Sequence, residues 1–166
     1  MKYWLLICTL LFSFCSCSDS ELPKDVQKSK ITAIVRCDIT SKANSDENEP
    51  KLLFTGDDIA WFNPTSREIK FTTVKSEPFS LPMYAQIDIQ LNNETLFTIV
   101  AHINEAVDRA YDDLVLFYDL ENSKYYLYDN YPNYWSPETT EVNRQHREVN
   151  WNKFLEQLKI EKKLKK

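Results

Sequence analysis

The stretch QIDIQLNNETLFTIVA, residues 86–101, decides the fold. Its first six residues alternate between polar and apolar side chains, which is the period of a strand with one buried face. Asn92 and Asn93 follow, and asparagine tolerates the positive φ that a two-residue hairpin turn requires. Residues 96–101 then return as an apolar segment. The stretch therefore predicts an antiparallel hairpin, and we expect the rest of the sheet to be built in the same way.

Other parts of the chain have strand character as well. Residues 31–40 alternate, with Ile31, Ala33, Val35, Cys37 and Ile39 on the apolar side. Residues 59–74 predict a hairpin that turns at Asn63-Pro64-Thr65-Ser66. Residues 114–118 and 125–128 are rich in β-prone side chains and predict a third hairpin. Between these regions, Leu52–Thr55 is a short apolar segment, which Gly56-Asp57-Asp58 turns into Ile59.

The C-terminal part of the chain has helical spacing instead. Ser136 is a suitable N-cap, and Pro137 suits the first helical position. The pattern predicts an amphipathic helix of about 20 residues whose apolar face is formed by Trp151, Phe154, Leu155 and Leu158, extended upstream by Val142, His146 and Val149. Similar spacing predicts a short helix over residues 103–112.

These elements predict the fold class α+β: an antiparallel β-sheet of six or seven strands built from hairpins, with the C-terminal helix packed on one face. The chain has no internal repeat, and residues 31–166 have the length of one domain.

The N-terminus has the pattern of an export signal. Lys2 precedes an apolar run at residues 3–14, which is too short for the roughly 20 residues that span a bilayer. Ser16 and Cys17 then supply the small residue before a cysteine that lipoprotein processing requires. The residues resemble a bacterial lipoprotein signal, which implies a signal peptide at residues 1–16, a lipid on Cys17 and a flexible tether over residues 17–30. The alternative is an ordinary secretory signal with incidental cysteines.

The tract Ser18-Asp19-Ser20-Glu21 indicates where such a lipoprotein would reside. It looks like the acidic tethers that send lipoproteins of Bacteroidota to the outer face of the outer membrane. We therefore expect an outer-membrane protein, lipid-anchored and exposed on the cell surface. The periplasmic face is the alternative.

Composition excludes several classes of protein. Gly56 is the only glycine, whereas average usage of about 7% predicts about a dozen, so no phosphate-binding loop can be written. The chain carries 20 basic against 25 acidic side chains, which argues against a nucleic-acid partner. Cys37 is the one thiol left after processing and lies on the apolar side of its strand, where a buried, inert thiol is usual. His102 and His146 match no zinc pattern, so we expect no cofactor and no metal.

No catalytic motif is present, but two acidic pairs deserve a test as functional groups. Asp57-Asp58 and Asp112-Asp113 carry adjacent carboxylates, the groups used by calcium sites and by acid–base hydrolysis. Neither pair has the spacing of a calcium loop, and we expect the first in a turn and the second at a helix end.

Aromatic residues form the most suggestive cluster. Six tyrosine and tryptophan side chains occur within residues 125–135, and the last three, Tyr131, Tyr134 and Trp135, lie in a proline-containing loop. Such side chains suit sugar rings and protein hot spots because they bury much area while ordering few rotors. Packing over the edge of the sheet is the competing interpretation.

Four segments look similar to small lipoproteins of gut Bacteroidota that carry no assigned activity: residues 56–64, 67–71, 113–116 and 124–127. The resemblance implies the location and transfers no functional residue. Our leading hypothesis is a non-enzymatic, membrane-anchored domain that binds a protein or a glycan through the sheet face or the 129–135 loop. The alternatives are a small hydrolase that uses carboxylates such as Asp57 and Asp58, and an inhibitor of an extracellular enzyme.

Overall fold

The computed structural model describes residues 29–36, 50–72, 79–81, 85–102 and 109–166. The predicted signal peptide, Cys17 and Cys37 lie outside these residues. Of the predicted tether, residues 17–30, only Ser29 and Lys30 are described, and Ser29 is buried, so the ordered domain begins before the predicted end of the tether. The described elements in chain order are β1 (Ile31–Val35), β2 (Lys51–Thr55), the 3₁₀ turn η1 (Gly56–Asp58), β3 (Ile59–Phe62), β4 (Glu68–Phe71), β5 (Gln86–Leu91), β6 (Glu94–His102), β7 (Val115–Asp119), β8 (Lys124–Tyr128) and α1 (Pro137–Ile160).

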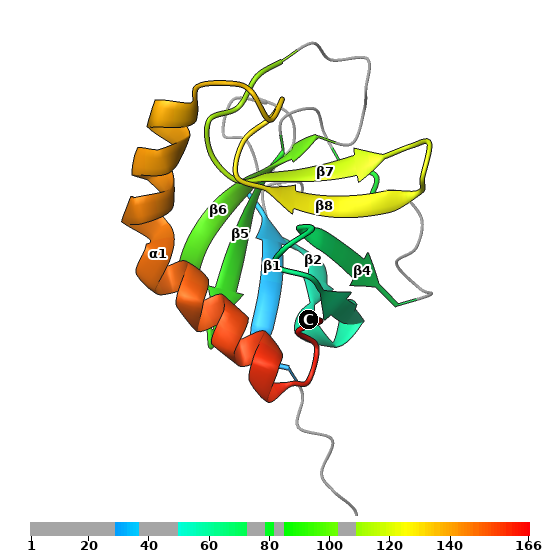
Figure 1. Cartoon of the computed structure of the whole chain (residues 1–166). Coiled ribbons are helices and arrows are strands. Elements are labelled where there is room, and N and C mark those ends of the chain that lie inside the picture. Colours follow the sequence, from blue (N-terminus) through cyan, green and yellow to red (C-terminus); the bar gives the residue numbers. More distant parts are fainter. Residues whose placement is uncertain (1–28, 37–49, 73–78, 82–84, 103–108) are drawn as a thin grey trace, which may run out of the picture.

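The strands form one eight-stranded sheet in the order β2-β1-β5-β6-β7-β8-β4-β3, accompanied by the single long helix α1 (Figure 1). The predicted class, α+β, is confirmed, but the predicted number of six or seven strands is too low. The short segment at residues 51–55 is itself a strand, because it pairs as an edge strand with β1. Its pairing partner lies 20 residues upstream of it, so no local turn marks it as half of a hairpin.

All three predicted hairpins form. In the β5–β6 hairpin, Asn92 and Asn93 adopt φ values of 53° and 68°, as the two-residue turn requires. In the β3–β4 hairpin, the side-chain oxygen of Asn63 accepts hydrogen bonds from the backbone N–H groups of Thr65 and Ser66. The β7–β8 hairpin turns through Ser123, which has a φ of 52°. In these hairpins, asparagine, serine and, at residue 67 of the β3–β4 turn, arginine supply the positive φ values that glycine often supplies.

One pair of neighbouring strands departs from the hairpin scheme. β6 and β7 are parallel, with Ala101 opposite Leu116 and His102 opposite Phe117. Parallel neighbours need a crossover of about a dozen residues, and residues 103–114 supply it. The helix predicted for residues 103–112 lies mostly outside the described residues. Its described end, residues 109–112, is not helical, because Tyr111 forms a β-bridge with Tyr131 instead.

The sheet curls so that its two edges approach one another. The edge strands β2 and β3 are consecutive in the chain, and only the three residues of η1 separate them. An eight-stranded sheet whose edges are joined by so short a turn must bend into a half-closed barrel. The open edge of β3 is covered in turn by the C-terminal residues, because Phe62 exchanges backbone hydrogen bonds with Lys163 and Lys165.

Helix α1 packs against the inner face of this curled sheet and runs alongside β6 and β5 (Figure 1). Phe154 and Leu158 are buried, and the ring of Phe154 contacts Phe62 of β3 and Phe97 of β6. The C-terminal half of the predicted apolar face, from Trp151 to Leu158, is therefore confirmed. Strand alternation then places Thr98, Val100 and His102 of β6 on the outer face.

The prediction for the N-terminal half of the helix face is wrong. Val142, His146 and Val149 are exposed, whereas Arg147 is buried. Polar side chains face the sheet here: Asn143 donates to the carbonyl oxygen of Asp112, Arg147 contacts Asp113 and Asp129, and Asn150 donates to the carbonyl oxygen of Leu96. Hydrophobic periodicity fails in this part of α1 because the inward stripe continues with hydrogen-bonding groups.

The ends of α1 differ from expectation in detail. Ser136 occupies the N-cap position with a φ of 44°, and its side chain makes no capping hydrogen bond to the backbone. At the other end, Lys162 has a φ of 58°, the N–H of Lys162 bonds the carbonyl of Lys159 and the N–H of Lys163 bonds that of Leu158. These two bonds form a Schellman cap, which reverses the chain toward β3.

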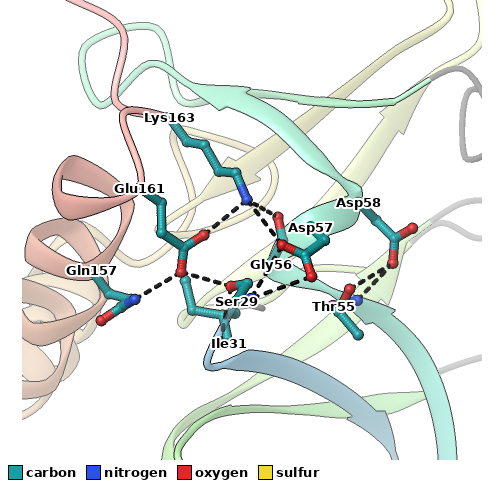
Figure 2. A network of polar contacts seen from close by, with 9 residues as sticks. All are labelled: Ser29, Ile31, Thr55, Gly56, Asp57, Asp58, Gln157, Glu161 and Lys163. Carbon is teal, nitrogen blue, oxygen red and sulfur yellow. Dashed lines mark hydrogen bonds and ion pairs between the residues drawn. The ribbon is translucent and has the colours of Figure 1, made fainter. Parts of the chain in front are cut away.

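A polar network ties the start of the described chain to its end (Figure 2). The Ser29 hydroxyl donates to Glu161, whose carboxylate also accepts hydrogen bonds from Gln157 and Lys163. The backbone N–H of Ser29 donates to the carboxylate of Asp57. The first strand, η1 and the helix end are thereby fixed to one another.

Candidate functional site

The outer face of β6, β7 and β8 carries a row of aromatic rings. Strand pairing places Phe117 opposite both His102 and Tyr126, so the side chains of these three residues point to the same face. Tyr128 is two residues from Tyr126 on the same strand, and its ring stacks on that of Tyr126 with a centroid distance of 5.1 Å and an angle of 6°. Tyr131 closes the row, at 5.0 Å from Phe117 and 4.4 Å from His102.

The rings in this row pack against one another, several of them face to face. Phe117 lies between Tyr128 and Tyr131, with centroid distances of 5.9 Å and 5.0 Å. Each of these three side chains is partly exposed, and burial raises the pKa of the Tyr128 hydroxyl above its ordinary value. The stacked arrangement leaves few open ring faces on which a sugar could lie. The row is therefore a packed support for the loop that follows β8.

The loop after β8, residues 129–136, is attached to this support. Tyr131 and Tyr111 exchange two backbone hydrogen bonds of 2.9 and 2.6 Å. The side-chain amide of Asn130 donates to the carbonyl oxygens of Asn133 and Trp135. The N–H of Trp135 bonds the carbonyl of Pro132 at 2.8 Å. The loop is thus held in one conformation by its own hydrogen bonds.

The three aromatic residues predicted for ligand binding occupy two different environments. Tyr131 is packed between His102 and Phe117, so packing accounts for its position. Tyr134 and Trp135 are exposed, at 78% and 48% of their surface. The two lie three and four residues after Tyr131, within about 14 Å of it along the chain. Two exposed aromatic side chains therefore lie on a loop that is held by its own hydrogen bonds.

A cluster of ion pairs joins Asp129, the first residue of this loop, to helix α1. The carboxylate of Asp129 contacts the guanidinium groups of both Arg67 and Arg147. Arg147 also contacts Asp113, and its side chain is only 8% exposed. Arg67 lies 4.5 Å above the ring of Trp151. Four of these residues, Arg67, Asp129, Arg147 and Trp151, line a cavity between the β3–β4 turn and the middle of α1.

The acidic pairs considered for hydrolysis make contacts that belong to the fold. Asp57 accepts from the N–H of Ser29, and Asp58 accepts from both the N–H and the hydroxyl of Thr55. As predicted, this pair lies in a turn. Asp113 does not lie at a helix end as predicted, because the helix it was assigned to is absent there and its carboxylate pairs with Arg147 instead.

The two histidines have different surroundings. His102 is buried at the end of β6 among the rings of Tyr111, Phe117 and Tyr131, and His146 is exposed on α1. Within the described ranges, no three His, Cys, Asp or Glu side chains converge on a point where a metal ion would be held. In the same ranges no helix has the length and apolar character to cross a bilayer.

Sequence reasoning missed the arginine cluster. Arg147 precedes Trp151 by four residues and Phe154 by seven, so it lies on the predicted inward stripe, and its spacing was a usable signal. Arg67 and Asp129 gave no comparable signal, because their meeting depends on the pairing of β4 with β8.

Comparison with protein-family models, curated proteins and solved structures finds no match to this chain.

Proposed function

We propose that the protein is a non-enzymatic binding domain, anchored in the outer membrane by a lipid on Cys17, which holds a glycan or a protein through the 129–135 loop. The observation that carries the proposal is the exposure of two consecutive aromatic residues, Tyr134 and Trp135, on a loop fixed by backbone and side-chain hydrogen bonds. Exposed aromatic side chains on an ordered loop bind with little further loss of conformational entropy.

The size of this surface favours a glycan over a protein. An aromatic side chain buries about 150–250 Å² in a contact, so the two exposed rings together offer less than the roughly 800 Å² that each partner buries in a standard protein interface. A sugar ring needs only one or two open aromatic faces. A protein ligand would have to contact the partly exposed side chains of Phe117, Tyr126 and Tyr128 in addition.

The hydrolase alternative receives less support. Asp57 and Asp58 are hydrogen-bonded to Ser29 and Thr55, contacts that hold η1 in place. A general acid and base would need to be directed at a substrate cavity instead.

The experiment is a screen of the purified chain from residue 18 against an array of plant, host and bacterial glycans, followed by titration calorimetry with the best ligand. We expect Tyr134→Ala and Trp135→Ala each to weaken binding at least about tenfold, since a stacking contact contributes on the order of 1–3 kcal/mol in comparable aromatic sites. Leu120→Ala is the matched control, because Leu120 is also half exposed but lies in the β7–β8 turn.

Two results would contradict the glycan proposal. One is an array without any ligand. The other is a ligand whose affinity is the same for wild type and for both loop variants, since that would place the binding surface elsewhere.

A further inference from the structure

A cavity of about 410 Å³ opens between the β3–β4 turn, the end of β8 and the middle of α1. Three arginines and one aspartate line it together with an indole ring and two turn residues: Arg67, Arg144, Arg147, Asp129, Trp151, Pro64 and Thr65. The lining residues thus carry three positive charges and one negative charge. Such an excess is unexpected on a body whose acidic side chains outnumber its basic ones.

Arg67 is held in place at both ends. Its backbone has a φ of 63°, a region that costs a residue with a Cβ roughly 1–2 kcal/mol. Its carbonyl oxygen accepts a hydrogen bond of 2.9 Å from the N–H of Leu127, and its guanidinium lies over the ring of Trp151. The side chain is 16% exposed. The guanidinium is therefore positioned before any ligand arrives.

Only one of the carboxylates that contact the three arginines lines the cavity with them. Asp129 is shared between Arg67 and Arg147, so one carboxylate serves two guanidinium groups. Asp113 pairs with Arg147 and Glu141 pairs with Arg144, but neither carboxylate lines the cavity.

Donor groups remain for a ligand. A guanidinium has five N–H donors, and the contacts within the described chain use one nitrogen of Arg67 and two of Arg147. Burial lowers the pKa of Arg67, opposed by Asp129 and reinforced by Arg147 and Arg144, yet an arginine remains protonated at neutral pH. An oxyanion entering the cavity would accept hydrogen bonds from the remaining guanidinium donors.

We propose that this cavity binds an oxyanion group, the carboxylate, sulfate or phosphate of a ligand, through Arg67, Arg144 and Arg147. Planar guanidinium groups match the paired oxygens of these anions. The indole of Trp151 and the ring of Pro64 offer apolar walls for the carbon atoms attached to such a group. The proposal does not depend on the aromatic loop, because neither Tyr134 nor Trp135 lines the cavity.

The test is titration of the purified chain from residue 18 with sodium phosphate, sodium sulfate and sodium glucuronate at low ionic strength, followed by calorimetry and by NMR of the arginine side chains. We expect at least one of the three anions to bind and to shift the Nε–H signals of Arg67 and Arg147. Chloride should weaken binding, because the contact is electrostatic. The anion that binds most tightly identifies the source of the group: an acidic sugar, a sulfated ligand or a phosphate.

Two arginine variants and a matched control test which residues bind the anion. Arg144→Gln is expected to weaken binding about tenfold without unfolding the chain, since its side chain is 60% exposed. Arg67→Gln should weaken binding by at least as much. Arg36→Gln removes the same charge from a side chain that is 51% exposed and lies outside the cavity, so it should change affinity less than twofold.

Failure of all three anions to bind at concentrations up to about 50 mM would overturn the proposal. So would equal loss of affinity in Arg144→Gln and Arg36→Gln, because that would reduce the effect to net charge. If Arg67→Gln does not fold, Arg144→Gln decides the question by itself. Tyr134→Ala and Trp135→Ala retain all three arginines, so anion binding should survive in them even if the glycan proposal fails.

Discussion

The ammonium group of Lys163 donates a hydrogen bond of 2.6 Å to the carbonyl oxygen of Gly56, 107 residues earlier in the chain (Figure 2). The same ammonium group contacts Glu161 at 2.8 Å, and Glu161 accepts from Ser29. The single glycine of the sequence thus lies where the first strand, the 3₁₀ turn and the end of the helix meet. Its φ is not positive, so conformation does not explain it.

Close approach explains this glycine. A Cβ on Gly56 would lie 1.8 Å from the hydroxyl oxygen and 2.7 Å from the Cβ of Ser29. We expect Gly56→Ala to lower the free energy of unfolding by about 1–3 kcal/mol, the usual cost of overpacking. Urea denaturation of the wild type and the variant measures this difference in the free energy of unfolding. Ser29→Gly removes both clashing atoms, so the double variant should lose less stability than the two single changes added together. Simple additivity would contradict the steric explanation.

The same network makes the stability of the folded chain depend on pH. Burial raises the pKa of Glu161, but hydrogen bonds from Gln157, Lys163 and Ser29 outweigh burial, so the pKa is lower than that of an ordinary glutamate. A folded-state pKa below the unfolded one contributes stability that is complete above the unfolded value of about 4.3 and disappears as pH falls through the folded value.

We therefore expect the wild-type chain to lose stability between about pH 5 and pH 3, and Glu161→Gln to lose less over that interval. Urea denaturation at pH 7, 5, 4 and 3 measures both. Glu156→Gln is the matched control, since Glu156 is more exposed and pairs only with Lys159. Parallel pH profiles for wild type and Glu161→Gln would remove Glu161 as the source.

Arg147 is expected to contribute more to stability than its neighbour Arg144. Replacing it with methionine keeps a similar volume, but it removes the ion pair with Asp113 and leaves Asp129 paired with Arg67 alone among the described residues, which we expect to cost about 2–4 kcal/mol. Arg144→Met removes a surface pair with Glu141 and should cost less than about 1 kcal/mol. Thermal and urea denaturation of the two variants compare them directly. Similar small losses in both would show that Arg147 is adequately replaced by an apolar side chain.

The inward face of α1 can be mapped by substitution. Phe154 is 2% exposed and contacts Phe62, Phe97 and Trp151, so Phe154→Ala should cost about 3–5 kcal/mol. Val149 is 69% exposed, and Val149→Lys should change stability by less than about 0.5 kcal/mol. The sequence pattern placed both residues on the apolar face. A large loss in Val149→Lys would therefore favour the pattern over the structure.

Local signals in the sequence were sufficient for the hairpins and for the lower part of α1. The alternation at residues 86–91, the asparagine turn and the spacing of Phe154 and Leu158 each arise from contacts within a few turns of chain, and each was predicted correctly. The alternation at residues 31–35 likewise gave the buried side of β1.

What the sequence did not reveal depends on contacts between distant residues. The parallel pairing of β6 with β7, the meeting of both sheet edges at Gly56 and the arginine cluster around Asp129 all need the finished topology. The aromatic loop is an intermediate case. Composition indicated a binding surface at Tyr131, Tyr134 and Trp135, but only the register of β7 and β8 shows that Tyr131 belongs to the packed row.

The proposed anchor is open to a direct measurement on cells. Cys17 lies twelve residues before Ser29, and a tether of that length spans at most about 40 Å. If Cys17 carries the lipid, wild-type protein should take up labelled palmitate and fractionate with the outer membrane, and Cys17→Ser should do neither. Cys15→Ser is the matched control, because residue 15 belongs to the predicted signal peptide. Protease added to intact cells should then remove the wild-type protein without lysis. Full protection from protease would place the domain on the periplasmic face, where extracellular glycans are not available, and the search for a ligand would move to components of the cell envelope.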